Sequence, residues 1–288
     1  MRPTALALIL LSAGFHAIWN AFVKVSRDKQ AFMWLIQVPS LILVLPFFLA
    51  SDPAPVPLLG WVMIAASALI HVLYAMSLGA AYAGGDLSLV YPLARSAPVF
   101  VPIWAVWWLD ERPTALGFAG IGLVVVGAYI LGIDPGRTTR LWEPLLALRR
   151  RDVQWAWATA LLISLYHITD KVGVAVVSPL RFQYLMALAR ILLYTGAIVP
   201  WKGRQLAEEA RIHWRSVVTF SVLQFLAYQL VLIAMTMAPV SYVAAVRQVS
   251  VLLAVFTGSV MLREGHLLLR LTAAGAITAG VSLIGWKG

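Results

Sequence analysis

The chain has 288 residues, of which 61% are hydrophobic and only 12% are charged, and its mean hydropathy is +0.86. Soluble domains carry about 25% charged residues, so this composition excludes an ordinary soluble protein. The formal net charge of +10 would suit a nucleic acid, but most basic residues lie in short connections between apolar segments, where they orient a membrane protein and contact lipid headgroups.

Ten apolar segments follow one another along the chain. A helix needs roughly 20 apolar residues to cross a hydrocarbon core of about 30 Å, whereas strands of a membrane barrel would alternate over about ten residues. The predicted spans are residues 3–23, 31–50, 57–80, 88–109, 114–133, 153–175, 181–200, 214–237, 240–262 and 266–286. Residues 201–215 are predicted to form a polar loop. The sequence therefore predicts an all-α polytopic membrane protein with ten transmembrane helices.

An acid and three glycines recur in register around the fifth and tenth spans. They are Glu111, Gly122, Gly127 and Gly132, repeated 153 residues later as Glu264, Gly275, Gly280 and Gly285. This pattern indicates two related five-helix repeats, residues 1–133 and 153–288, joined by a basic linker at 134–152. Because five is odd, the second repeat is expected to be inverted, an arrangement that builds a site near the midplane. The glycines are expected to allow close helix packing, and each acid to favour the N-terminal end of the helix that follows it.

The basic residues of the connections also predict an orientation. Fourteen lysines and arginines fall on one side of the predicted spans, and four fall on the side that carries both termini. By the positive-inside rule, both termini are expected outside the cytoplasm.

Polar residues inside the first and third spans are the first candidates for a substrate site. His16, Trp19 and Asn20 fall on one helical stripe of the first span, and His71 and Tyr74 are three residues apart in the third. Polar and ionisable groups in a bilayer are costly, so they are expected to face a cavity or one another. The alternative for each is an interhelical hydrogen bond, worth roughly 0.6 kcal/mol on average.

Arg95 in the fourth span and Arg247 in the ninth stand at matching positions of the two repeats. A guanidinium binds carboxylate or phosphate oxygens through two parallel hydrogen bonds, which makes both residues candidates for holding an anion. Tyr91 lies four residues before Arg95 and is expected near the same helix face. The alternative is that each arginine bonds backbone carbonyls at a broken helix or pairs with an acid.

The sixth span repeats the first, because His167 corresponds to His16, and it adds Asp170 and Lys171. All three are candidates for proton coupling, and His167 is also a candidate for substrate binding. Asp170 is the only acid well inside a span, and its alternative role is to neutralise Lys171 or an arginine. Gln224 and Tyr228, four residues apart in the eighth span, complete the substrate-binding candidates.

Two stretches carry a family resemblance: HAIWNAFVK in the first span, and YPLARSAPVFVPIWAVWWLDERPTALGFAGIGLVVVGAYILG over the fourth and fifth, which APVSYVAAVRQVSVLLAVFTGSVMLREG echoes in the second half. The chain resembles an EamA-type transporter of the drug/metabolite transporter superfamily over nearly its whole length. The resemblance implies a basket of ten helices with a cavity lined chiefly by spans 1, 3, 4, 6, 8 and 9. Many members are drawn with cytoplasmic termini, the reverse of the orientation that the charge count predicts.

The cations inside the spans outnumber Asp170, which favours an anionic or zwitterionic ligand. We therefore predict a secondary transporter, an exporter, of a small metabolite such as an amino acid or a related carboxylate or phosphonate in the bacterial inner membrane. The expected partners are this substrate, lipid and protons, with no nucleic acid, and the expected state is a monomer, with a dimer as the alternative. No HExxH, GxSxG or P-loop motif and no cysteine occur, so no catalytic residue, metal or cofactor is expected.

Two other functions remain open at this level. One is a multidrug or cationic-metabolite efflux pump, which would need an acid exposed in the cavity, a role open only to Asp170. The other is a lipid-carrier flippase or a non-transporting partner subunit, which would show little transport of soluble solutes.

Overall fold

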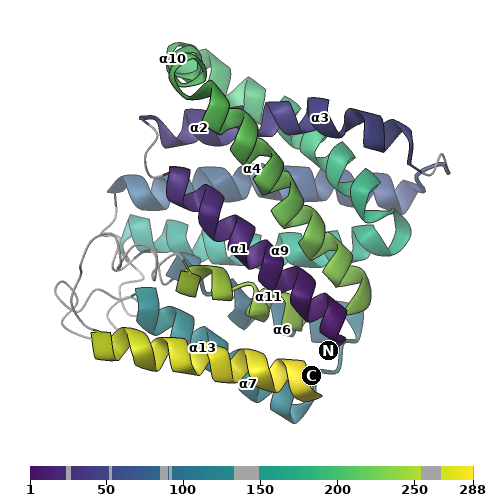
Figure 1. Cartoon of the computed structure of the whole chain (residues 1–288), viewed down its shortest axis with the longest axis vertical. Helices are drawn as coiled ribbons and strands as arrows, with labels where there is room; N and C mark the ends of the chain where they lie inside the picture. Colours follow the sequence, from purple (N-terminus) through teal and green to yellow (C-terminus); the bar gives the residue numbers. More distant parts are fainter. Residues whose placement is uncertain are drawn as a thin grey trace.

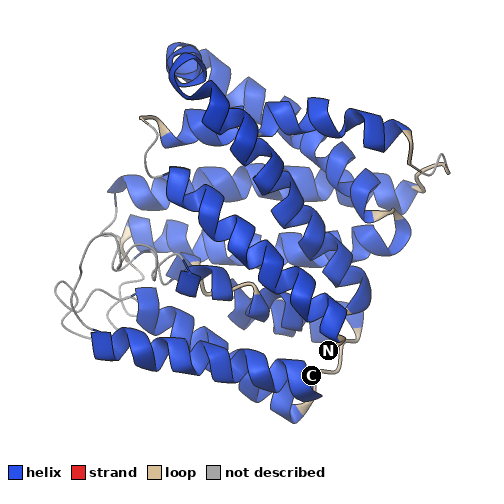
Figure 2. Cartoon of the chain, in the orientation of Figure 1, coloured by secondary structure: helices blue, strands red, loops and turns tan. Residues whose placement is uncertain are grey.

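The structure, a computed structural model, describes residues 1–23, 27–51, 54–84, 90, 93–132, 149–253 and 267–287, a part that is helical and contains no strand (Figure 2). The helices of the first half are α1 (Pro3–Val23), α2 (Lys29–Leu35), α3 (Gln37–Leu49), α4 (Leu58–Gly84), α6 (Ala97–Leu109) and α7 (Ala115–Gly132). Those of the second half are α9 (Arg151–Val176), α10 (Pro179–Met237), α11 (Val240–Val246) and α13 (Leu267–Lys287).

Four stretches of helix are each long and apolar enough to cross a membrane, by length and composition. They are Ala31–Leu49, Leu58–Tyr82, Arg151–Val176 and Ile198–Met237. Five shorter apolar helices accompany them: Pro3–Trp19, Ala97–Leu109, Ala115–Ile130, Val240–Leu253 and Leu271–Trp286. The predicted fold, an all-α membrane protein built from two inverted five-helix repeats, is confirmed.

The two halves interlock instead of forming separate bundles. α4 packs along α9, α1 along α10, and α7 along α13, so each of these pairs joins the first half to the second (Figure 1). In the repeat, α1 corresponds to α9, and α4 corresponds to the last third of α10. The contact between α4 and α9 is therefore equivalent to the contact between α10 and α1, because exchanging the two repeats converts one into the other. This equivalence is expected for repeats that are related by a pseudo-twofold axis.

The polar segment at residues 201–215 is helical, so the prediction of a loop was wrong. α10 covers 59 residues, and only Lys202 (φ −130°, ψ 19°) and His213 (φ −116°, ψ 21°) depart from helical geometry. These two kinks separate the seventh and eighth predicted spans from a short polar helix between them. Its sequence is rich in Gln, Leu, Ala, Glu and Arg, which favour helix. The segment also buries Leu206 and Glu209, and Lys202 donates to the carboxylate of Asp28 at 2.7 Å, which holds it against the first half.

Glycines allow the last helices of the two halves to touch, as predicted for Gly127 and Gly280. A Cβ on Gly280 would lie 2.5 Å from the carbonyl oxygen of Gly120, and one on Gly127 would lie 2.7 Å from that of Ala273. Such distances are shorter than any real Cβ contact, so only glycine fits. The prediction was wrong for Gly122 and Gly275, because a Cβ built on either of them meets no other described helix within 4 Å.

Glu111 caps a helix of the opposite half, and not the following helix as the sequence predicts. Its carboxylate accepts hydrogen bonds from the backbone N–H groups of Val240 (2.6 Å) and Ser241 (3.3 Å) and from the Ser241 hydroxyl (2.8 Å). Val240 begins α11, so the acid does lie at the positive end of a helix, but one 129 residues away. The repeat-related Glu264 lies outside the described residues.

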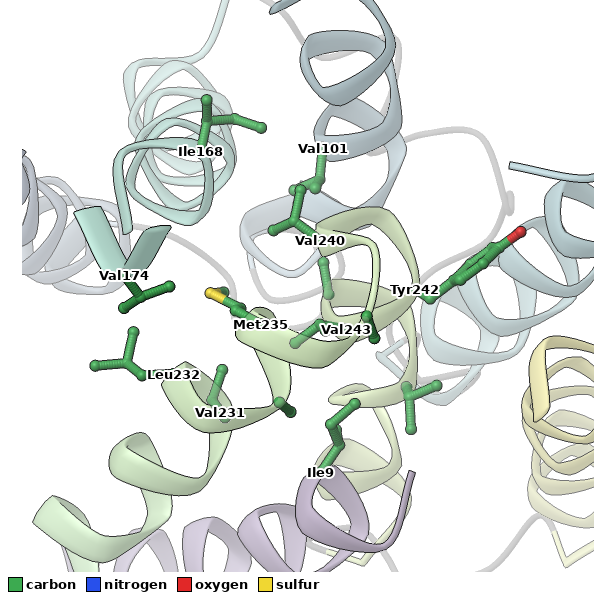
Figure 3. Close-up of a cluster of buried hydrophobic side chains, with 14 of the residues drawn as sticks. Ile9, Val101, Ile168, Val174, Val231, Leu232, Met235, Val240, Tyr242 and Val243 are labelled. Carbon is green, nitrogen blue, oxygen red and sulfur yellow. The ribbon is translucent and has the colours of Figure 1, made fainter. Parts of the chain in front are cut away.

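A cluster of buried apolar side chains fills the space between the halves at one end of the molecule. It includes Ile9 of α1, Val101 of α6, Ile168 of α9, Met235 of α10 and Val243 of α11 (Figure 3). Both chain termini lie at this end, close to the junction of α10 with α11 (Figure 1). In a bilayer such side chains associate through van der Waals contact and not through release of water. The cluster therefore packs the two halves against each other at the end that carries the termini.

Candidate functional site

The two predicted arginines lie at breaks in their helices. Arg95 occupies a turn directly before α6, and Arg247 occupies the turn that follows α11. The breaks are tied across the halves, because the side-chain nitrogen Nε2 of Gln248 donates to the carbonyl oxygen of Arg95 at 3.0 Å. Interrupted helices that meet near the middle of a repeat interface are a recurring way to build a transport site.

A cavity of about 60 Å³ lies at these breaks. Five predicted site residues line it, contributed by α1, α4, α9 and the two breaks: His16, Tyr74, Arg95, His167 and Arg247. Three further polar residues line it that were not among the predictions: Tyr166, Gln248 and Ser250. Small-molecule sites have volumes of about 300–1,000 Å³, so in this closed state the cavity has room only for water, and the halves must move apart before a metabolite can enter.

His167 and Arg247 are bonded to each other in the wall of the cavity. Nδ1 of His167 lies 2.7 Å from the carbonyl oxygen of Ile163, so this nitrogen is the donor. Nε2 is then free to accept, and Nη1 of Arg247 lies 3.2 Å from it. The bond to the Ile163 carbonyl thus fixes the tautomer of His167, and His167 in turn orients one edge of the Arg247 guanidinium. The other N–H groups of this guanidinium have the planar geometry that binds carboxylate or phosphate oxygens.

Tyr166 is the centre of a group of aromatic rings beside the cavity. Its ring stacks on His71 with centroids 4.2 Å apart and on His167 at 4.6 Å, and it meets Tyr74 edge-on at 6.0 Å. Cζ of Arg247 lies 5.5 Å from the ring centroid of Tyr228, within cation–π range. The predicted residues His71 and Tyr228 therefore lie next to the cavity wall, one ring removed from the cavity itself.

Asp170 is fully buried and is held by two hydroxyl groups. Ser67 of α4 donates to its Oδ1 at 2.5 Å, and Tyr228 of α10 donates to its Oδ2. The neighbouring ammonium of Lys171 points elsewhere and donates to the carbonyls of Met235 (2.5 Å) and Ala238 (3.0 Å) at the end of α10. Asp170 therefore does not form the ion pair with Lys171 that was one alternative for it.

Two further predicted residues, Trp19 and Gln224, do not line the cavity. Trp19 lies in an apolar cluster with Phe32 and Phe220, although its ring meets His16 at 5.1 Å, and Gln224 is half-buried on α10. The backbone of Asn20 belongs to α1, but its side chain lies outside the described part of the structure, as does all of Tyr91.

The positions of some unpredicted site residues in the sequence could have identified them. Gln248 follows Arg247 directly, and Tyr166 precedes His167, so both neighbour predicted positions in the sequence. Ser67 lies one helical turn before His71 and on the same face of α4, but an isolated serine in an apolar helix is common. Only the fold brings it to Asp170, 103 residues away.

Comparisons with known proteins agree with this architecture. A family model described as the EamA-like transporter family matches residues 3–133 and 151–286. A protein of Sinorhizobium sp., named an uncharacterized transporter in the cobO 3′ region, is 28% identical over 131 residues, which are 93% of that protein and 43% of this chain. That relative therefore corresponds to about half of this chain. A crystal structure described only as that of a protein superposes with a TM-score of 0.71 at 14% identity, covering 98% of this chain and 99% of the other, which shows the shared fold.

Proposed function

Because the chain belongs to the EamA-like transporter family, we propose that it carries a small anionic or zwitterionic metabolite, an amino acid or a related carboxylate or phosphonate, out of a bacterial cell across its inner membrane. The observation that carries this proposal is the meeting of Arg95 and Arg247 at one cavity. Two guanidinium groups and no carboxylate line that cavity among the described residues. A cavity with this charge balance attracts anions and disfavours cations.

Alternating access is the mechanism that the fold suits. The apolar cluster and Glu111 close the space between the halves at the end that carries the termini. With both termini outside the cytoplasm, this arrangement is the state closed to the outside. Rocking of the inverted halves about the arginine-bearing breaks would open this end and close the other around the same site.

The cation-pump alternative lacks an acid where it needs one. Asp170 is fully buried, and both of its oxygens accept hydrogen bonds from Ser67 and Tyr228. A cationic substrate in the cavity would face Arg95 and Arg247 instead, which would repel it. The flippase and partner-subunit alternatives are separated from transport of soluble solutes by the experiment below.

The test is solute exchange by the purified chain in proteoliposomes with labelled aspartate, alanine, succinate and choline. Wild type is expected to exchange the first three and not choline. Arg95→Gln and Arg247→Gln are each expected to weaken exchange of aspartate and succinate at least tenfold. The matched control is Arg112→Gln, because the Arg112 side chain is 84% exposed and, among the described residues, bonds only Asp110. Exchange of choline alone would support the cation pump, and no exchange by folded protein would support the flippase or partner subunit.

A further inference from the structure

We propose that His71, Ser67 and Asp170 form a proton relay beside the cavity, so that the substrate anion and one proton cross the membrane together. The proposal rests on the proposed transport function. It concerns how transport is driven, which the arginines of the cavity do not determine.

The relay is a continuous line of hydrogen-bonding atoms between α4 and α9. Nδ1 of His71 lies 2.8 Å from the carbonyl oxygen of Ser67 and 3.3 Å from its hydroxyl oxygen, so the N–H donates to both. The hydroxyl of Ser67 in turn donates to Oδ1 of Asp170 at 2.5 Å. All three side chains are buried, at 7%, 0% and 0% exposure. The line begins one ring away from the cavity, because His71 stacks on Tyr166.

A proton can move along this line with every atom accounted for. A hydronium ion that reaches His71 from the cavity past the ring of Tyr166 gives a proton to Nε2 and leaves water behind, while Nδ1 gives its proton to the hydroxyl oxygen of Ser67, which passes its own proton to Asp170. The products are a neutral His71 with its proton on Nε2, an intact Ser67 hydroxyl and an uncharged carboxylic acid. The reverse sequence returns the proton. No oxidant, metal or cofactor takes part.

The groups that face Asp170 come from every element around it. Ser67 of α4 and Tyr228 of α10 bond it, and Arg190 of α10, Arg247 after α11 and Tyr166 of α9 interact with it electrostatically. His71 reaches it through Ser67, and the ammonium of Lys171 points away from it to the end of α10. Its two direct hydrogen bonds come from neutral hydroxyls. Arg190 is close enough to interact with it electrostatically, yet Nε of Arg190 is buried with no hydrogen-bond partner among the described residues. A buried carboxylate without a direct ion pair is a group poised to bind a proton.

Tyr228 connects the relay to the cavity. Its hydroxyl donates to Asp170, and its ring lies under the guanidinium of Arg247. An anion bound by Arg247 and an ionised Asp170 are both stabilised by the positive charges of Arg247 and Arg190, and the two negative charges repel each other. Neutralising Asp170 therefore favours anion binding, and by linkage anion binding favours protonation of Asp170 by the same factor. This sign predicts transport of anion and proton in the same direction, so that export runs down the gradient of the metabolite and takes a proton out with it.

The first experiment measures the proton directly. Purified protein in weak buffer with a pH-sensitive dye is mixed with aspartate, which has no titration of its own between pH 6 and 8. Wild type is expected to take up a proton on binding, and Asp170→Asn is expected to bind aspartate without uptake. Asp110→Asn is the control, because the Asp110 side chain is 82% exposed. Proton release on binding, or uptake unchanged in Asp170→Asn, would overturn the proposal.

The second experiment uses proteoliposomes and a small substitution that preserves folding. In wild type an acidic exterior is expected to drive accumulation of labelled aspartate, and Ser67→Ala is expected to exchange aspartate while losing at least tenfold of this accumulation. Ser77→Ala is the matched control, because Ser77 is also buried on α4 and also bonds α9, through Thr159 at 3.0 Å. Exchange that ignores the pH gradient in wild type refutes the relay and leaves the proposed function intact, whereas no exchange of any anionic probe refutes the proposed function.

Discussion

Oε1 of Glu111 lies 2.6 Å from the backbone nitrogen of Val240, and this bond joins the two halves of the protein at the first residue of α11. From the other side of the same junction, Lys171 donates to the carbonyls of Met235 and Ala238. The chain between α10 and α11 is thus held by an acid at its free N–H groups and by a cation at its free carbonyls. Because Arg247 lies at the far end of the short helix α11, these contacts also fix one wall of the cavity.

The first prediction concerns Glu111→Gln. A hydrogen bond to a charged group contributes about 1.5–3 kcal/mol, so loss of the charge is expected to populate the state open at the termini end roughly tenfold more. The chain has no cysteine, so a single Val243→Cys, at a fully buried position of α11, can report this opening. An impermeant thiol reagent should label it faster in Glu111→Gln and not in Glu208→Gln, whose acid is half exposed on α10. Equal labelling rates in all three proteins would contradict a closing role for Glu111.

The sequence predicts most of the fold because a membrane-spanning helix can be recognised from the length and hydrophobicity of its segment alone. The internal repeat also predicts that Arg95 and Arg247 belong to the site. A cation inside a membrane span is costly, so two cations at matching positions of the two halves are expected to find polar partners at the interface between the halves. No pattern in the sequence predicts which residues of one half contact which residues of the other. The partner of Glu111 lies 129 residues away, and nothing local distinguishes α11 from α7 as the helix that it caps. The same holds for Ser67, whose role depends on the register of α4 against α9.

A second prediction separates structure from proton coupling at Lys171. Lys171→Met removes both hydrogen bonds to the carbonyls at the end of α10, and leaving these buried acceptors without a donor costs about 1–3 kcal/mol each. The variant is therefore expected to unfold at a lower temperature, while any exchange that remains still responds to the pH gradient. Thermal unfolding in detergent and aspartate accumulation in proteoliposomes measure the two effects. A variant of normal stability that ignores the gradient would restore Lys171 as a proton-coupling residue.

The third prediction uses pairs of glycines on the same two helices. Gly280→Ala would place a Cβ against the carbonyl of Gly120, and forcing α7 and α13 apart is expected to cost about 1–3 kcal/mol. Gly275→Ala on α13 meets no other described helix and is expected to be neutral or to stabilise by about 0.5–1 kcal/mol, because alanine favours helix. Denaturation of both variants in the same detergent provides the comparison. Similar stabilities would mean that the contact between α7 and α13 adapts to the extra methyl group.

The fourth prediction concerns Gln248, which donates to the carbonyl oxygen of Arg95 and so ties the two helix breaks together. Gln248→Leu removes this donor without changing the charge of the cavity. Misplacing Arg95 relative to Arg247 is expected to raise the KM for aspartate about tenfold, equivalent to roughly 1.4 kcal/mol. The preference for anions over choline should persist, because both guanidinium groups remain. Gln205→Leu, at an exposed position of α10, is the control. If Gln248→Leu instead admitted choline, Gln248 would act on selectivity directly, and the positioning role argued from its bond to Arg95 would not hold.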